Sequence, residues 1–98
     1  MLDQTLRQQM KALLEQQAYT TRELAGQMGI TERQVEDHLS HLAKTLAHDD
    51  RRRLCLIPPS CMHCGFVFRQ RKKLTRPSRC PHCRSERIIP PRYVIQVP

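Results

Sequence analysis

The chain has 98 residues, only 4% of them aromatic, and a formal net charge of +8. This length fits one domain or two very small ones, and pieces of about 50 residues bury little apolar surface and are marginally stable without a metal ion, a disulfide or a partner. No apolar run follows the polar residues 1–5, so we expect no signal peptide, no membrane association and a cytoplasmic location.

The charge is divided unevenly along the chain. Residues 1–50 contain five Lys/Arg and eight Asp/Glu, a net charge of −3, whereas residues 51–98 contain twelve Lys/Arg and one acid, Glu86, a net charge of +11. A basic half of this density predicts a phosphate-binding surface. The alternative interpretation is a solvated face that only keeps the protein soluble.

The first helix is predicted over residues 3–18. Its apolar side chains recur at the helical spacing of three and four residues: Leu6, Met10, Leu13 and Leu14. Tyr19 breaks this pattern. Thr20 and Glu23 then have the sequence of a capping box, so we expect a second helix to begin there and to run to about Met28.

A tight turn separates the second helix from the third. Gly29 suits a left-handed backbone conformation, and Thr31 with Gln34 forms another capping box. The third helix then carries a single apolar stripe, and it should end near residues 47–50; the stripe consists of Val35, Leu39, Leu42 and Leu46.

The segment 21–39 resembles a helix-turn-helix through its Glu-Leu-Ala run, its Gly-Ile turn and the stripe on the following helix. The resemblance implies that the start of the third helix enters a DNA major groove, which makes Thr31, Arg33 and Gln34 candidate contacts. Acidic neighbours oppose this role, because phosphate neutralisation supplies most DNA affinity: Glu32, Glu36 and Asp37. The helical half therefore either binds DNA with help from a basic segment or binds a protein.

Short strands are expected in the second half. A charged joint comes first, and its three residues are candidate nucleic-acid contacts that would help the helical half to bind DNA: Arg51, Arg52 and Arg53. Strand candidates follow at 54–57, 66–68, 88–89 and 93–95, with Pro58-Pro59 and Pro90-Pro91 as interruptions. We predict an α+β protein, with a three-helix, winged helix-turn-helix domain over 1–57 and a small antiparallel zinc ribbon over 58–98.

Two C-x-x-C pairs are the strongest motif of the sequence. They are separated by fifteen residues and comprise Cys61, Cys64, Cys80 and Cys83. Two cysteines in one tight turn direct both sulfurs at one ion, and two such turns complete a tetrahedron. Because protein fills all four positions, we expect a structural zinc ion. Iron in a rubredoxin-like centre and a redox-active pair are less favoured alternatives.

A basic loop joins the two pairs, and its cations are candidate phosphate contacts: Arg69, Arg71, Lys72, Lys73, Arg76 and Arg79. The stretch from Cys61 to Leu74 and from Pro77 to Cys83, taken with residues 20–46, resembles the predicted prokaryotic transcriptional regulators in which a helix-turn-helix is fused to a C-terminal zinc ribbon. That resemblance implies a DNA-binding regulator of transcription.

Several alternatives stay open at this point. RNA is a second ligand class, with Phe66, Phe68 and Tyr93 as stacking groups, although their spacing favours core positions. An interaction module that docks on a transcription or translation assembly is a different class of function. A homodimer is expected for a single small DNA-reading motif. An enzyme is not expected, because the sequence has no Ser/His/Asp arrangement and no glycine-rich phosphate loop.

Overall fold

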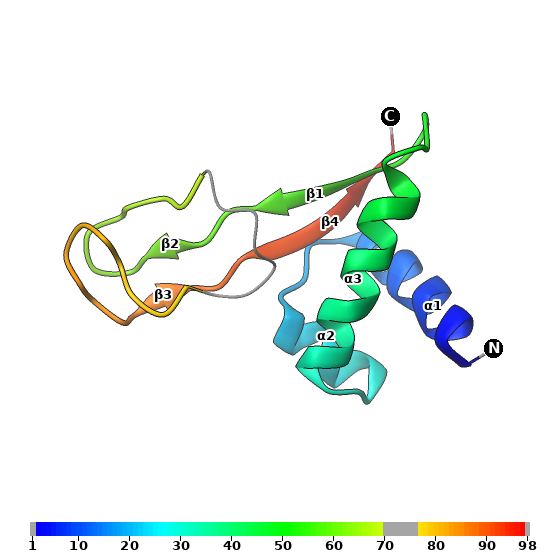
Figure 1. Ribbon diagram of the computed structural model, residues 1–98, viewed down its shortest axis with the longest axis horizontal. Helices are drawn as coiled ribbons and strands as arrows, with labels where there is room; N and C mark the ends of the chain where they lie inside the picture. Colours follow the sequence, from blue (N-terminus) through cyan, green and yellow to red (C-terminus); the bar gives the residue numbers. More distant parts are fainter. Residues whose placement is uncertain (1, 70–76, 98) are drawn as a thin grey trace.

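The structure, a computed structural model, describes residues 2–69 and 77–97. Three helices come first: α1 (Leu2–Gln16), α2 (Thr21–Met28) and α3 (Glu32–Leu46). Four short strands follow: β1 (Arg53–Ile57), β2 (Ser60–Cys61), β3 (Ile88–Ile89) and β4 (Arg92–Gln96). Figure 1 shows the helices packed at one end of a long pair of strands. The predicted α+β class is confirmed.

Both capping boxes form as predicted. The Glu23 N–H donates to Thr20 Oγ1 at 3.0 Å, and the Thr20 N–H donates to Glu23 Oε1 at 2.8 Å. Gly29 closes α2 with a φ of 67°, in the left-handed region that glycine enters without a steric penalty. These local signals fix where α2 ends and where α3 begins.

The strands form two antiparallel pairs, β1 with β4 and β2 with β3. Tyr19 lies in the connection between α1 and α2. It pairs with the other edge of β4 through an antiparallel bridge to Tyr93, so one residue takes the place of a third strand. Across the sheet, β4 therefore lies between Tyr19 and β1. Because this sheet follows three helices, the β1–β4 hairpin has the position of the wing in a winged helix-turn-helix.

One register runs through both strand pairs. Arg53 faces Gln96 and Ile57 faces Arg92 in the first pair, while Cys61 faces Ile88 in the second. Two residues on each strand separate the first pair from the second, so neither strand has an extra residue between them. Pro58-Pro59 therefore stands opposite Pro90-Pro91. Proline has no N–H to donate, so the ladder is interrupted at these four residues without a change of register.

The main core lies between the helices and the hairpin. Its helical members include Met10, Leu14 and Leu39, which are fully buried. Two residues near the end of the chain belong to the same core, Tyr93 and Ile95, exposed by 0% and 2%. The two sequence domains are therefore joined in space. The ribbon stands at the tip of the hairpin, and its exit strand β4 completes the helical core.

The ribbon has little core of its own. The buried cluster there consists of Cys61, Cys80 and Ile88, with Phe68 and Cys83 packed against it. Such a small apolar cluster is insufficient to stabilise a fold, which explains why this half depends on a metal ion.

The predicted strand at 66–68 is shorter in the structure than its sequence pattern indicated. Only Val67 forms a bridge, to Ser60, although the Cys61 N–H donates to the Phe66 carbonyl at 2.8 Å and the Phe68 N–H to the Pro59 carbonyl at 3.0 Å. The rings of Phe66 and Phe68 meet edge to face at 5.0 Å, as expected for two residues that share one face of an extended segment.

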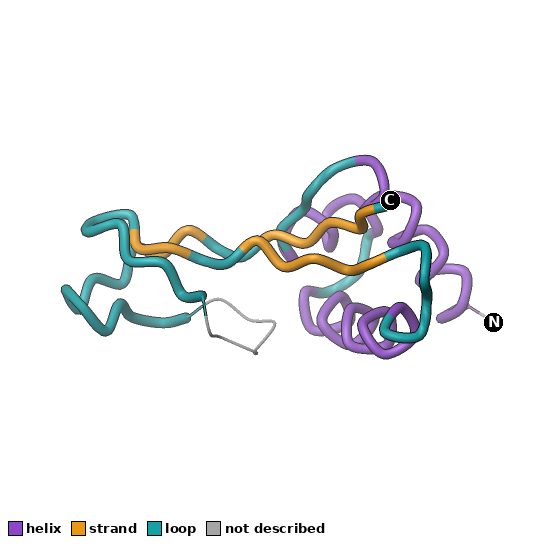
Figure 2. Tube along the Cα trace, turned by 90° about the horizontal axis from the view of Figure 1, so that it is seen from above, coloured by secondary structure: helices purple, strands orange, loops and turns teal. Residues whose placement is uncertain are grey.

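The molecule is elongated, with extents of 44 × 29 × 20 Å. Figure 2 shows the strands continuing from the helices into the ribbon as one projection. We call this projection the arm; it comprises residues 53–69 and 77–96. Within the described residues, no helix combines the length and apolar character needed to cross a membrane.

Candidate metal centre and nucleic-acid interface

The four predicted cysteine ligands meet at the tip of the arm. The Sγ atoms of Cys61, Cys64, Cys80 and Cys83 all lie within 4.8 Å of one another. Cys61 and Cys83 are 3.5 Å apart at sulfur, and Cys64 and Cys80 are 3.6 Å apart. A Zn–S bond of about 2.3 Å in a tetrahedron places the sulfurs about 3.8 Å apart, so the cluster has the size that zinc requires.

The two cysteine turns repeat each other at an interval of nineteen residues. The Gly65 N–H donates to the Cys61 carbonyl at 3.0 Å, and the Arg84 N–H donates to the Cys80 carbonyl at 2.9 Å. The N–H groups of His63 and His82 each donate, at 3.3 Å, to the first sulfur of their own turn. Both histidines are exposed. The two histidines therefore act through their backbone N–H groups, which donate to the sulfurs. The four thiolates complete the ligand set without the imidazole rings.

The two turns close through different residue types. Gly65 has a φ of 79°, and Arg84, at the equivalent position, has a φ of 63°. A left-handed conformation suits glycine but costs a residue with a side chain on the order of 1 kcal/mol. Arg84 is the one residue other than glycine with positive φ in the described part of the chain.

The thiols of the cluster have widely separated pKa values. Hydrogen bonds from the backbone N–H groups of Cys64 and His63 lower the pKa of Cys61 from 9.0 to about 6. The Ser85 N–H lowers the pKa of Cys83, but burial and the three neighbouring sulfurs outweigh it and raise the pKa to about 12. Four sulfurs this close cannot all be thiolates without a cation between them.

The ligand set is therefore complete and supplied by protein alone. Such a site holds zinc as a structural ion and leaves no position for water or substrate. One zinc ion with four thiolates carries a net charge of −2, which the surrounding N–H groups stabilise. Cys55 lies apart from this cluster, on β1 opposite Val94.

The candidate contacts on α3 are only partly available. Thr31 Oγ1 accepts the Gln34 N–H at 3.1 Å, and Gln34 Oε1 accepts the Thr31 N–H at 2.9 Å. The side-chain oxygens of both residues are thus engaged in closing the start of the helix. Arg33 is exposed, and it is flanked there by exposed acids such as Glu32 and Asp37.

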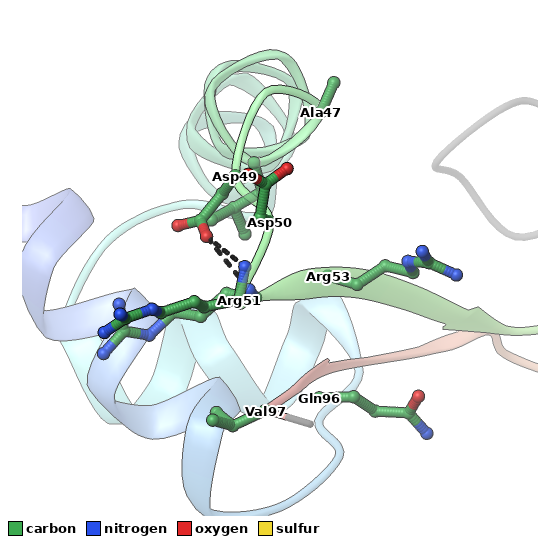
Figure 3. A pocket seen from close by; sticks show the side chains of 9 residues that line it. Ala47, Asp49, Asp50, Arg51, Arg53, Gln96 and Val97 are labelled. Atoms are coloured by element: carbon green, nitrogen blue, oxygen red, sulfur yellow. Dashed lines mark hydrogen bonds between the residues drawn. The ribbon is translucent and has the colours of Figure 1, made fainter.

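The charged joint before β1 is organised by an aspartate. Asp49 Oδ1 accepts the N–H groups of Arg51 at 2.7 Å and Arg52 at 3.1 Å, and the first of these bonds is the largest cause of the lowered pKa of Asp49. Figure 3 shows the two hydrogen bonds of this turn as dashed lines, with Arg53 and Gln96 to one side of it. These residues line a hollow of about 830 Å³ together with others that include Leu46 and Val97.

The three arginines of the joint do not act as one patch. The Nε atom of Arg52 lies 3.0 Å from Glu15 Oε1 on α1, so Arg52 is held against the helices by an ion pair. Arg51 and Arg53 are exposed. Of the three candidates, Arg52 is therefore the one whose charge is already compensated.

The ribbon candidates divide in a similar way. Arg71, Lys72, Lys73 and Arg76 lie outside the described residues. Arg69 is exposed, whereas Arg79 lies 3.6 Å from Glu86, the only acid of the basic half.

Three exposed arginines of the arm were missed by the sequence reasoning: Arg84, Arg87 and Arg92. They stand singly and outside the basic loop, so charge density along the sequence did not reveal them. Aligning the two cysteine turns would have found Arg84 opposite Gly65.

Residues 5–55 match the family described as PF0610-like, N-terminal, and residues 58–97 match the PF0610 rubredoxin-like zinc beta-ribbon domain. The fold is similar to the solution NMR structure of protein PF0610 from Pyrococcus furiosus, with a TM-score of 0.77 and 31% sequence identity over 96% of this chain and 90% of that chain. No curated protein shows significant similarity to the sequence. The chain belongs to the PF0610-like family, and it joins this N-terminal domain to a rubredoxin-like zinc ribbon.

Proposed function

We propose that this protein binds nucleic acid through its arm and acts as a DNA-binding regulator of transcription. The observation that carries the proposal is the charge of the arm's surface. The arm has six exposed arginines in the described residues and a single acid, Glu86; the arginines are Arg53, Arg69, Arg79, Arg84, Arg87 and Arg92. Cations spread along a projection of this kind suit the phosphates of a nucleic-acid backbone.

The placement of the arm favours duplex DNA. The hairpin stands where a wing flanks a helix-turn-helix, so α3 and the arm would approach one duplex together. In this arrangement the arm supplies affinity through phosphates, and Arg33 is the exposed cation at the start of α3. RNA stacking is weakly supported, because the Tyr93 ring is fully buried and Phe68 packs on the ribbon core.

A salt series tests this proposal. Fluorescence anisotropy of zinc-loaded protein with random duplex DNA, single-stranded DNA and RNA should show salt-dependent binding, strongest for the duplex. Contacts from the six exposed arginines predict a slope of log K against log salt of about −5. An Arg53→Ala/Arg92→Ala variant should lose more affinity than an Arg22→Ala/Lys44→Ala control, which removes two exposed cations from the helices. Absence of salt-dependent binding to all three probes would refute the proposal.

A second function is favoured by the exposed side of α3. Glu32 and Asp37 are exposed beside Arg33, and Glu36 is half-buried, so this surface suits a basic protein partner as well as it suits DNA. Under this alternative the protein docks on a transcription or translation assembly. Capture of a partner from nuclease-treated extract that is lost in a Glu32→Lys/Asp37→Lys variant, but retained in Arg53→Ala/Arg92→Ala, would favour it.

A further inference from the structure

The second cysteine turn departs from the first in one informative way. The two turns have the same backbone hydrogen bonds, and both close with a residue of positive φ. This conformation favours glycine, which is the residue found in the first turn, at Gly65. Arg84 occupies that position with a φ of 63° and an exposed side chain. Strained residues of this kind are concentrated at functional sites, and here the long cationic side chain is the feature that glycine would lack.

The guanidinium group of Arg84 forms no ion pair with a carboxylate in the described part of the molecule. Its only neighbouring acid in sequence, Glu86, lies 3.6 Å from Arg79. A guanidinium held in a strained turn and not paired with a carboxylate of the described residues is suited to an external anion, and phosphate matches its fork of N–H donors.

Arg87 supplies a second cation three residues later. The Ser85 Oγ accepts the Arg87 N–H at 3.2 Å, and the Arg87 carbonyl accepts the Met62 N–H at 2.9 Å, so this short segment is fixed to the first cysteine turn. The next residue, Ile88, faces the metal cluster and is 3% exposed. Arg87 lies immediately before β3, and its side chain is exposed.

We propose that Arg84 and Arg87 form a phosphate-binding pair that anchors the tip of the arm to the backbone of a nucleic acid. This inference rests on the proposed function and assigns it two contact residues outside the basic loop. Zinc fixes the turn, the turn holds Arg84 in its left-handed conformation, and the segment 84–87 presents both guanidinium groups to the ligand. The structural competitor is a role for Arg84 in offsetting the −2 charge of the zinc–thiolate centre.

The test uses the full-length, zinc-loaded chain and an Arg84→Gly variant, in which the charge is removed and the left-handed turn becomes favourable. We expect about tenfold weaker binding to random duplex DNA and a salt slope that is smaller by about one, with thermal midpoint and zinc affinity equal to or above those of the wild type. Arg84→Lys should retain most of the affinity, and Arg84→Gly/Arg87→Ala should reduce the slope by about two. Lys44→Ala, which removes one exposed cation from α3, is the matched control.

The outcomes separate the competing explanations. Wild-type protein that binds no nucleic acid would refute the proposed function and this inference with it. Wild-type binding that Arg84→Gly matches in affinity and slope would overturn the inference alone. Weaker zinc binding in Arg84→Gly, with unchanged DNA affinity of the zinc-loaded form, would overturn it in favour of charge compensation at the metal.

Discussion

Tyr19 and Tyr93 exchange both of their backbone hydrogen bonds across 74 positions of the chain. The Tyr19 N–H donates to the Tyr93 carbonyl at 2.9 Å, and the Tyr93 N–H donates to the Tyr19 carbonyl at 2.8 Å. This pair connects the link between α1 and α2 with the strand that returns from the zinc ribbon. The folded structure of the helical half is therefore coupled to the folded structure of the metal centre.

Removal of zinc should disturb the helices as well as the ribbon. We expect chelation to unfold the ribbon and to free β4, so that the amides of Tyr19 and Tyr93 lose protection from hydrogen exchange. The Leu24 amide, which donates to Thr20 within the start of α2, provides a comparison. Unchanged exchange at Tyr19 after complete zinc removal would show that the two halves fold independently.

Truncation of Tyr93 should destabilise the helical half, although the residue follows all four zinc ligands in sequence. Its side chain is fully buried in the helical core, so Tyr93→Ala is expected to cost about 3–5 kcal/mol of unfolding free energy. Val94→Ala, on the opposite and half-buried face of the same strand, is the control and should cost clearly less. Urea denaturation followed by helical circular dichroism measures both, and equal losses would contradict the assignment of Tyr93 to this core.

The five cysteines should separate into two classes on replacement. Cys80→Ser removes a fully buried ligand and should abolish tight zinc binding, because an alcohol is a far poorer ligand than a thiolate. Cys55→Ser should keep one zinc ion per chain. Metal content after gel filtration distinguishes the two, and zinc loss in Cys55→Ser would place that residue in the centre after all.

Zinc affinity should depend on pH in two regimes. The lowered pKa of Cys61, about 6, means that this thiol is already ionised at neutral pH, whereas Cys83, with a pKa raised to about 12, releases its proton only when zinc binds. Below about pH 6 Cys61 also holds a proton that zinc must displace. The plot of log affinity against pH should steepen by about one below that value. A chromophoric chelator in competition measures this slope, and a constant slope would show that the metal-free turn does not hold Cys61 ionised.

The ion pair between Arg52 and Glu15 should contribute little. Both side chains are partly exposed, at 38% and 29%, so water screens the interaction and Glu15→Gln should cost less than about 1 kcal/mol. Thermal unfolding in low and high salt tests this. A larger loss would indicate that the pair fixes the angle between α1 and the hairpin.

Much of the architecture could be predicted from local signals. The two capping boxes at Thr20 and Thr31 gave the starts of α2 and α3, and the cysteine spacing gave the metal ligands, because each of these depends on residues close together in sequence. The partner of β4 could not be predicted in this way. Tyr93 and Ile95 have the alternation of any half-buried strand, and nothing in their neighbourhood shows that they return to the helices.

The candidate interface was harder to predict than the metal centre. Charge density along the sequence selected the basic loop, but whether a cation is free depends on partners distant in sequence. Arg52 was a candidate and proved to be paired with Glu15 on α1. Arg84 was overlooked because a single arginine adds little to the charge density of the sequence, and its position opposite Gly65 is seen only when the two cysteine turns are aligned.

The four facing prolines of the arm also protect the protein from its own copies. A two-stranded ribbon has two open edges, and open edges recruit further strands from neighbouring molecules. Pro58, Pro59, Pro90 and Pro91 offer no N–H group to such a strand at the middle of the arm, where the side chains of Pro59 and Pro91 are buried. The middle of the arm is therefore a poor template for a further strand from a neighbouring molecule.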